Sequence, residues 1–168
     1  MGKNIVLVGL MGAGKTSVGR LLAEKFGLDF IDVDEYIETT AGMKISDIFS
    51  RYGESKFREL EKNAILNLSQ NNDKIISTGG GALEDESNIK NLQANGIMIY
   101  LKATPERLFE RIKGQNHRPL LKNEKPLETL KELLKKREKN YLKADIIIET
   151  DQKSTDETVR KIGEICRL

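Results

Sequence analysis

Five short apolar runs recur along the chain, and stretches with helical periodicity separate them. Several of the runs are almost continuously apolar rather than alternating, which is typical of parallel strands covered by helices on both faces. They predict strands at residues 5–8, 30–33, 74–77, 97–101 and 145–148. This strand–helix alternation predicts an α/β fold, a three-layer sandwich in which helices cover both faces of a parallel sheet of about five strands.

The segments between the predicted strands show several kinds of sequence features that are typical of helices. A helix is expected over residues 15–26, and Thr104-Pro105-Glu106 supplies an N-cap, a proline at the first helical position and an acid in the first turn. Helical spacing of apolar residues predicts one helix before Gly53, another after it and an amphipathic C-terminal helix. Their apolar positions are Ile45, Ile48, Phe49 and Tyr52; Phe57, Leu60, Ala64, Ile65 and Leu68; and Val159, Ile162, Ile165 and Cys166. Residues 113–125 lack periodicity, and we interpret them as a lid.

Composition narrows the classes of protein that fit. A chain of 168 residues with 38% hydrophobic and 32% charged residues fits one globular domain. Its 28 basic and 26 acidic residues give a net charge of +2, which offers no support for a nucleic-acid or membrane partner. The single cysteine, Cys166, excludes an internal disulfide and is expected to serve in packing. With no targeting segment recognised, we expect a cytoplasmic protein.

The firmest chemical signal follows the first predicted strand. Residues 9–16, Gly-Leu-Met-Gly-Ala-Gly-Lys-Thr, fit the pattern G-x-x-x-x-G-K-[ST], with a helix expected directly after it. Glycines let the backbone amides turn towards an anion, and the helix N-terminus adds its positive end. Lys15 would then contact the β- and γ-phosphates and Thr16 a Mg²⁺ ion. A chance glycine turn is improbable in this context, but the pattern does not separate an ATPase, a GTPase and a small-molecule kinase.

Ligands of open α/β sheets bind beyond the carboxyl ends of the strands, so the residues there are informative. Asp32 and Asp34 follow the second strand, where one carboxylate can support a metal and the other can face an acceptor hydroxyl. A solvated acidic strand end or a helix N-cap explains them equally well. Glycines at 79–81 follow the third strand and indicate either a close approach of the backbone to a ligand or a flexible turn. Since Ser77 stands where many phosphate-loop proteins carry an aspartate, Asp32 is the natural metal ligand.

Arginines supply the third element of a site that handles anions. Arg58 has Glu61 three residues on, Arg118 lies in the lid candidate, and Arg137 follows a lysine-rich helical stretch. A guanidinium suits bidentate capture of a carboxylate or phosphate, although an isolated surface arginine is usually a solvated charge. The residues alone do not single out these three, and the only histidine, His117, is given no role.

Several motifs, in this order and spacing, resemble the shikimate kinase family over nearly the whole chain. They comprise residues 9–16, 30–34, 57–61, 77–81 and 118–121, together with Arg137 and Tyr141. The resemblance implies a single phosphate-loop kinase domain over 1–168, with strand order 2-3-1-4-5, substrate-binding helices at about 34–62 and a mobile lid at about 113–125. It also implies a monomer that uses ATP and Mg²⁺ to phosphorylate the 3-hydroxyl of shikimate in aromatic amino-acid biosynthesis.

The resemblance implies a role for each site residue. Lys15, Asp34 and Arg118 would be catalytic, with Asp34 as the base, and Thr16 and Asp32 would support the metal. ATP would contact Gly12, Ala13, Gly14, Lys15, Thr16, Ser17, Arg111, Arg118 and Gln152. Shikimate would contact Asp34, Arg58, Glu61, Gly79, Gly80, Gly81 and Arg137, with Phe49 and Phe57 as a wall.

One segment departs from the family pattern, and two other functions compete. The family often has a proline-containing loop after the fifth strand, whereas residues 150–154 contain none, so adenine contacts there are not defined by the pattern. A kinase of gluconate or of a nucleoside monophosphate is the rival enzyme. A neutral sugar or a nucleotide base would not call for two arginines aimed at a carboxylate. A non-catalytic nucleotide-binding regulator is the other alternative, and it would need neither Asp34 nor Arg118.

Overall fold

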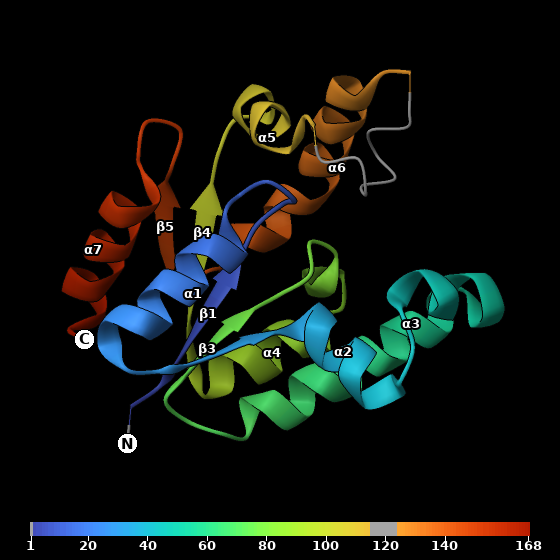
Figure 1. Cartoon of the computed structure of the whole chain (residues 1–168), viewed down its shortest axis with the longest axis horizontal. Coiled ribbons are helices and arrows are strands. Elements are labelled where there is room, and N and C mark those ends of the chain that lie inside the picture. Colours follow the sequence, from blue (N-terminus) through green and yellow to red (C-terminus); the bar gives the residue numbers. More distant parts are fainter. Residues whose placement is uncertain (1, 115–123) are drawn as a thin grey trace.

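The structure, a computed structural model, describes residues 2–114 and 124–168 and is built around one twisted parallel sheet (Figure 1). Its strands are β1 (Asn4–Val8), β2 (Asp29–Asp32), β3 (Lys74–Ser77), β4 (Gly96–Lys102) and β5 (Ile146–Glu149). They lie in the order β2-β3-β1-β4-β5, and every neighbouring pair is parallel. The predicted sheet and its strand order are confirmed.

Helices cover both faces of the sheet, as the nearly continuous apolar strands require (Figure 1). On one face α1 (Lys15–Phe26) packs beside α7 (Thr155–Cys166). The other face carries α4 (Glu86–Ala94) and the C-terminal part of α6 (Pro126–Tyr141), and α3 (Ile45–Ser69) packs against α4. The remaining elements are α2 (Val33–Ala41), the 3-10 helix η1 (Ala82–Glu84) and α5 (Pro105–Ile112). Strand β1 is buried over its whole length, so the core centres on it.

The helices begin and end largely at the capping residues and glycines that the sequence predicts. The Thr104 hydroxyl accepts a hydrogen bond from the Arg107 amide and caps α5, with Pro105 at the first helical position. Gly53 has a φ of 81° inside α3, which confirms the expected break between two helical segments. Of the apolar face predicted before this break, Ile48 is buried, whereas Tyr52 is 61% exposed.

Two element boundaries that bear on the site differ from the expected ones. The second strand ends at Asp32, not at residue 33, because the Asp32 carboxylate accepts hydrogen bonds from the amides of Asp34 and Glu35 and starts α2. Asp34 therefore lies in a helix rather than on the strand, and Asp32 caps that helix through its Oδ1 atom. Arg137 lies within α6 rather than after a helix, since α6 continues to Tyr141.

The pairing of β1 with β3 sets the position of the glycine segments. Leu7 of β1 is opposite Ser77 of β3. The next residue after Ser77 is Thr78, and its amide donates a hydrogen bond to the Leu7 carbonyl at 3.1 Å. The two strands run in the same direction, so residues 9–16 and 79–81 leave the sheet at the same edge. This edge is where the predicted phosphate loop and the predicted glycine turn meet.

None of the helices in the described residues combines the length and apolar character needed to cross a bilayer.

Gly96, at the start of β4, has no room for a side chain. A β-carbon there would lie 2.6 Å from the Leu92 carbonyl oxygen and 2.9 Å from a Val6 methyl group. Because one of these atoms is backbone, we expect Gly96→Ala to lower the free energy of unfolding by about 1–3 kcal/mol in urea denaturation. The control Lys90→Ala, at an exposed position of α4, should change it by less than about 0.5 kcal/mol. An unfolding midpoint for Gly96→Ala equal to that of the parent would contradict the close packing.

Candidate functional site

A cavity of about 760 Å³ opens at the carboxyl ends of the strands. It is lined by segments from distant parts of the sequence: the loop before α1, the start of α2, the turn after β3, α5, α6 and the segment from β5 to α7. The lining residues on which the site depends are Gly12, Ala13, Gly14, Lys15, Thr16, Ser17, Asp32, Asp34, Gly79, Gly80, Arg107, Arg111, Arg137, Thr150 and Lys153. Most of the side chains predicted for the site thus share one cavity.

The loop of residues 9–16 has the backbone shape of an anion cradle. Gly12 and Gly14 have φ values of 82° and 89°, and a β-carbon on Gly12 would lie 2.8 Å from the Leu108 carbonyl oxygen. Neither a side-chain cap nor an acidic residue in the first turn occupies the N-terminus of α1. The Lys15 ammonium donates to the carbonyls of Gly9 at 2.7 Å and Leu10 at 3.2 Å, which holds it over the loop. Open helix amides beside a held cation suit a phosphate group.

Oxygen donors suited to a hard divalent cation lie next to this loop. The Thr16 hydroxyl donates to Oδ2 of Asp32 at 3.2 Å, while Oδ1 of Asp32 is engaged in capping α2. Mg²⁺ typically binds one or two protein oxygens and completes its shell with phosphate oxygens and water. Among the described residues no group of three or more metal-ligating side chains gathers. The hydroxyl and carboxylate oxygens of the Thr16–Asp32 pair are of the kind that Mg²⁺ binds.

Asp34 is held in a setting that disfavours its charge. Burial first, and then the nearby carboxylates of Asp32 and Glu61, raise the pKa of Asp34 to about 6. Its Oδ1 atom and Oε2 of Glu61 are both buried without a hydrogen-bond partner among the described residues. A β-carbon on Gly79 would lie 3.1 Å from the first of these oxygens and 3.2 Å from the second. Two buried acceptor oxygens without a partner in the described residues thus lie over one glycine.

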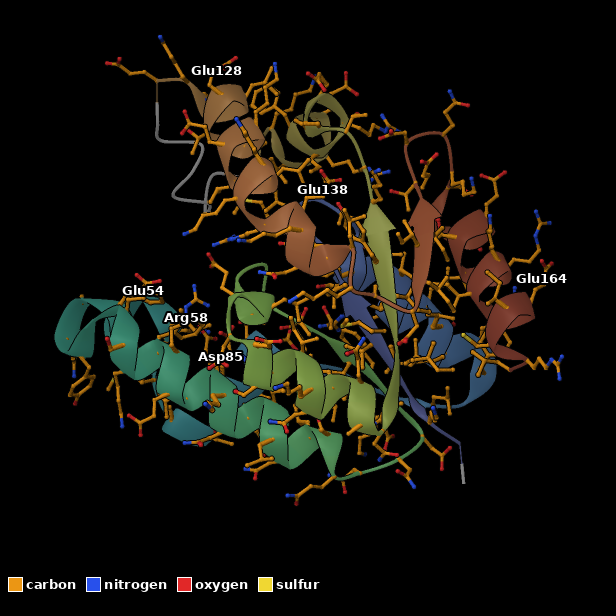
Figure 2. All side chains as sticks on the ribbon, turned by 180° about the vertical axis from the view of Figure 1, so that it is seen from behind. Glu54, Arg58, Asp85, Glu128, Glu138 and Glu164 are labelled. Atoms are coloured by element: carbon orange, nitrogen blue, oxygen red, sulfur yellow. The ribbon has the colours of Figure 1, made fainter. Side chains whose placement is uncertain are left out.

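Arg58 is fixed on α3 by acidic neighbours. It donates to Oε1 of Glu61 at 2.9 Å and to Glu54 at 3.4 Å, and Figure 2 shows Glu54 and Arg58 close together on this helix. The predicted pairing of Arg58 with Glu61 is confirmed. A β-carbon on Gly81 would lie 2.7 Å from Nη2 of Arg58, so the guanidinium lies against the glycine turn. Arg58, Glu61 and Gly81 border the cavity region without being among its lining residues.

One aromatic ring contacts this arginine, and a second ring packs on the first. The rings of Phe49 and Phe57 lie 4.8 Å apart, and the Arg58 guanidinium carbon lies 5.2 Å from the centre of the Phe57 ring. Phe57 is buried, whereas Phe49 is 38% exposed. The exposed ring of Phe49, packed on the ring that contacts the guanidinium, offers an apolar surface to the body of a small anionic ligand.

Arg137 approaches the glycine turn from α6. Its Nη1 atom would lie 3.4 Å from a β-carbon on Gly80, and the side chain is only 15% exposed. Tyr141, one helical turn further on, donates its hydroxyl to the Gly80 carbonyl and stacks on Tyr100 with ring centres 5.1 Å apart. Burial raises the pKa of Tyr141 above its ordinary value, so its hydroxyl remains a donor. Tyr141 thus holds the Gly80 carbonyl, and in the sequence it stood out only as part of a motif.

The opposite end of the cavity is formed by α5 and the segment after β5. Arg111 donates to the Thr150 carbonyl at 2.7 Å and to the Gly12 carbonyl at 3.4 Å, which links this segment to the phosphate loop. Arg107 and Lys153 also line this end, and no sequence motif singled them out. Gln152 is exposed and lines a separate surface depression. Arg118, and most of the predicted lid, lie outside the described residues.

Comparison with known proteins gives a consistent result. The family model described as shikimate kinase matches residues 11–167. Shikimate kinase of Thermodesulfovibrio yellowstonii is 48% identical over 95% of this chain and 92% of its own length, and that of Persephonella marina is 47% identical over 95% and 96%. The structure of Acinetobacter baumannii shikimate kinase in complex with shikimate has a TM-score of 0.92 and 39% identity, covering 98% of this chain and 93% of that one.

The raised pKa of Asp34 predicts a change in stability with pH. The pKa of Asp34 is about 6 in the folded protein, against an ordinary 3.8. Ionising this group therefore lowers the free energy of unfolding, with the full effect above about pH 6 and no effect below the ordinary pKa. Asp34→Asn should therefore be more stable than the parent at pH 7.5, by about 1–3 kcal/mol in urea unfolding. The difference should shrink as the pH falls from about 6 towards 4.

The matched control is Glu132→Gln, which neutralises an exposed carboxylate on α6 and should alter stability little at either pH. If Asp34→Asn and the parent were equally stable at both pH values, the environment described for Asp34 would be incorrect.

Proposed function

The chain belongs to the shikimate kinase family, and on that basis we propose that it transfers the terminal phosphoryl group of ATP to the 3-hydroxyl of shikimate, giving shikimate 3-phosphate and ADP. This reaction is a step of aromatic amino-acid biosynthesis. One observation carries the proposal: an anion cradle, an aspartate with an unpartnered oxygen and two arginines converge around the glycine turn at residues 79–81.

On the donor side, the loop of residues 9–16 holds the phosphate chain of ATP. Its amides and the open N-terminus of α1 face the phosphates, and Lys15 supplies a positive charge against the charge that develops on the transferred group. Thr16 and Asp32 would hold Mg²⁺, which neutralises phosphate charge when it is bound. The chemical suitability of this hydroxyl–carboxylate pair supports the assignment of the metal.

On the acceptor side, Arg58 and Arg137 bind the shikimate carboxylate beside the Gly80 backbone. The two guanidinium groups reach the glycine turn from different helices, α3 and α6, so a carboxylate held by both is fixed in orientation as well as in position. Glu61 orients Arg58 through the 2.9 Å ion pair. Phe49 and Phe57 form the wall against which the ring lies.

Asp34 is the base of this mechanism. Its carboxylate accepts the proton of the 3-hydroxyl while the hydroxyl oxygen bonds to the γ-phosphorus and the bond from that phosphorus to the β–γ bridging oxygen breaks. A pKa of about 6 suits the task because the group is ionised at neutral pH yet more basic than an ordinary aspartate. Asp34 lies at the start of α2 and both it and Lys15 line the cavity, which supports a base close to the phosphate loop.

Other parts of the assignment remain predictions. Arg118 is proposed to reach the transferring phosphoryl group from the lid, and Arg111 and Gln152 are proposed to lie at the adenine end. We also propose that the chain forms one kinase domain and acts as a cytoplasmic monomer without a nucleic-acid or membrane partner. The lid is proposed to exclude water, which otherwise competes with the hydroxyl as acceptor.

The substrate is tested by measuring ADP release from ATP with purified protein. Shikimate should support turnover, while gluconate and nucleoside monophosphates should give no release above background, because neither class offers a ring carboxylate to paired arginines. Product analysis should find shikimate 3-phosphate. Phosphorylation of gluconate or a nucleotide with shikimate inert would assign the protein to a different substrate.

The base is tested with Asp34→Asn. This variant should bind ATP as the parent does and lose about 10²–10⁴-fold in kcat, because it removes the proton acceptor and leaves the phosphate loop intact. In the parent, turnover should fall as the pH drops through the pKa of Asp34, whose value in the free protein is about 6. An Asp34→Asn variant with parental turnover would remove Asp34 from the mechanism.

A further inference from the structure

Glu84, the last residue of η1, lies between the two arginines proposed to bind the substrate carboxylate. Its Oε2 atom is 3.3 Å from Nη2 of Arg137 and 3.9 Å from Nη2 of Arg58, and its Oε1 atom is 3.0 Å from Nζ of Lys136. These contacts join η1 to α3 on one side and to α6 on the other. The adjacent Asp85, labelled in Figure 2, contacts Lys62 of α3 at 3.5 Å. No motif in the sequence pointed to Glu84.

Within the described residues Arg137 forms an ion pair with Glu84, and its side chain also has a hydrogen-bonding interaction with the Tyr141 hydroxyl. The Nε atom of Arg137 is buried without a hydrogen-bond partner there, so Nε gives the guanidinium no anchor. Arg58, in contrast, has Glu61 at 2.9 Å and Glu54 at 3.4 Å in addition to the long contact with Glu84. Loss of Glu84 should therefore affect the position of Arg137 far more than that of Arg58.

Glu84 contacts a different edge of the Arg137 guanidinium from the one that lies near Gly80. Arg137 and Gly80 line the cavity, whereas Glu84 does not, and Nη1 of Arg137 is the atom that lies near Gly80. The carboxylate of Glu84 thus holds one edge of the guanidinium and leaves another edge towards the cavity. It also offsets the repulsion between two arginines that approach the same glycine turn. The arginines keep Glu84 ionised, because Lys136, Arg137 and Arg58 together lower the pKa of its carboxyl group against the opposing effect of its partial burial.

We propose that Glu84 is a positioning residue for acceptor binding: through its contact with Nη2, it holds the Arg137 guanidinium in the orientation that captures the substrate carboxylate. This inference rests on the proposed function, since it concerns the arginine pair assigned to shikimate. Glu84 touches no reacting atom. Its loss is therefore expected to weaken acceptor binding while the phosphoryl transfer step proceeds nearly as before.

The test compares Glu84→Ala with the parent on two acceptors, shikimate and its methyl ester, which lacks the carboxylate charge. Glu84→Ala should raise the KM for shikimate about tenfold with kcat within about twofold of the parent, because a charge-assisted contact to the carboxylate is lost. The kcat/KM for the methyl ester should stay the same, since Arg137 has no anion to hold there. Glu84→Gln keeps an acceptor of the same length and should raise the KM for shikimate about threefold.

The matched control is Glu86→Ala, which removes an exposed carboxylate two residues away and should leave both KM values unchanged. Equal losses of Glu84→Ala on shikimate and the ester would indicate a general structural effect and overturn the proposal. A fall in the KM for shikimate would overturn it too, because Glu84 would then compete with the substrate. An active parent with an unaffected Glu84→Ala variant would contradict the role of Glu84 alone. A parent that failed to phosphorylate shikimate would instead contradict the proposed function.

Discussion

The parallel pairing of β1 with β3 is the constraint on which the site depends. The bond from the Thr78 amide to the Leu7 carbonyl fixes the register at the point where both strands end. Two glycine segments about seventy residues apart in sequence, 9–16 and 79–81, therefore emerge side by side. The first is the loop proposed to hold phosphate, and the second is approached by side chains from α2, α3 and α6. A shift in this register would move the acceptor site away from the phosphate loop.

The charged groups with unfavourable surroundings lie where the chemistry is proposed to occur. Asp34 is buried near Asp32 and Glu61, and its charge is disfavoured in the absence of a ligand. The positive groups opposite it, Arg58 and Arg137, approach the same glycine turn and are separated by Glu84. These unfavourable charges lower the stability of the ligand-free protein. A ligand that brings hydroxyl groups to Asp34 and a carboxylate to the arginines would relieve this cost on binding.

The sequence predicted most of this arrangement, and its failures have physical reasons. The phosphate loop, the sheet and the Arg58–Glu61 pair follow from local spacing, which a sequence displays directly. The strand end at Asp32 was missed because an aspartate that caps a helix and one that extends a strand look alike until the next amides are placed. Glu84 and Tyr141 act through contacts between η1, α6 and the glycine turn. Those contacts are long-range, so no periodicity reveals them.

A crystal structure of the protein with ADP and shikimate bound together tests the central claim most directly. The account predicts one acceptor molecule in the cavity, its carboxylate contacting Arg58 and Arg137 and its 3-hydroxyl within hydrogen-bond distance of Asp34, facing the phosphate loop. Shikimate bound elsewhere, or bound there with its carboxylate turned away from both arginines, would contradict it.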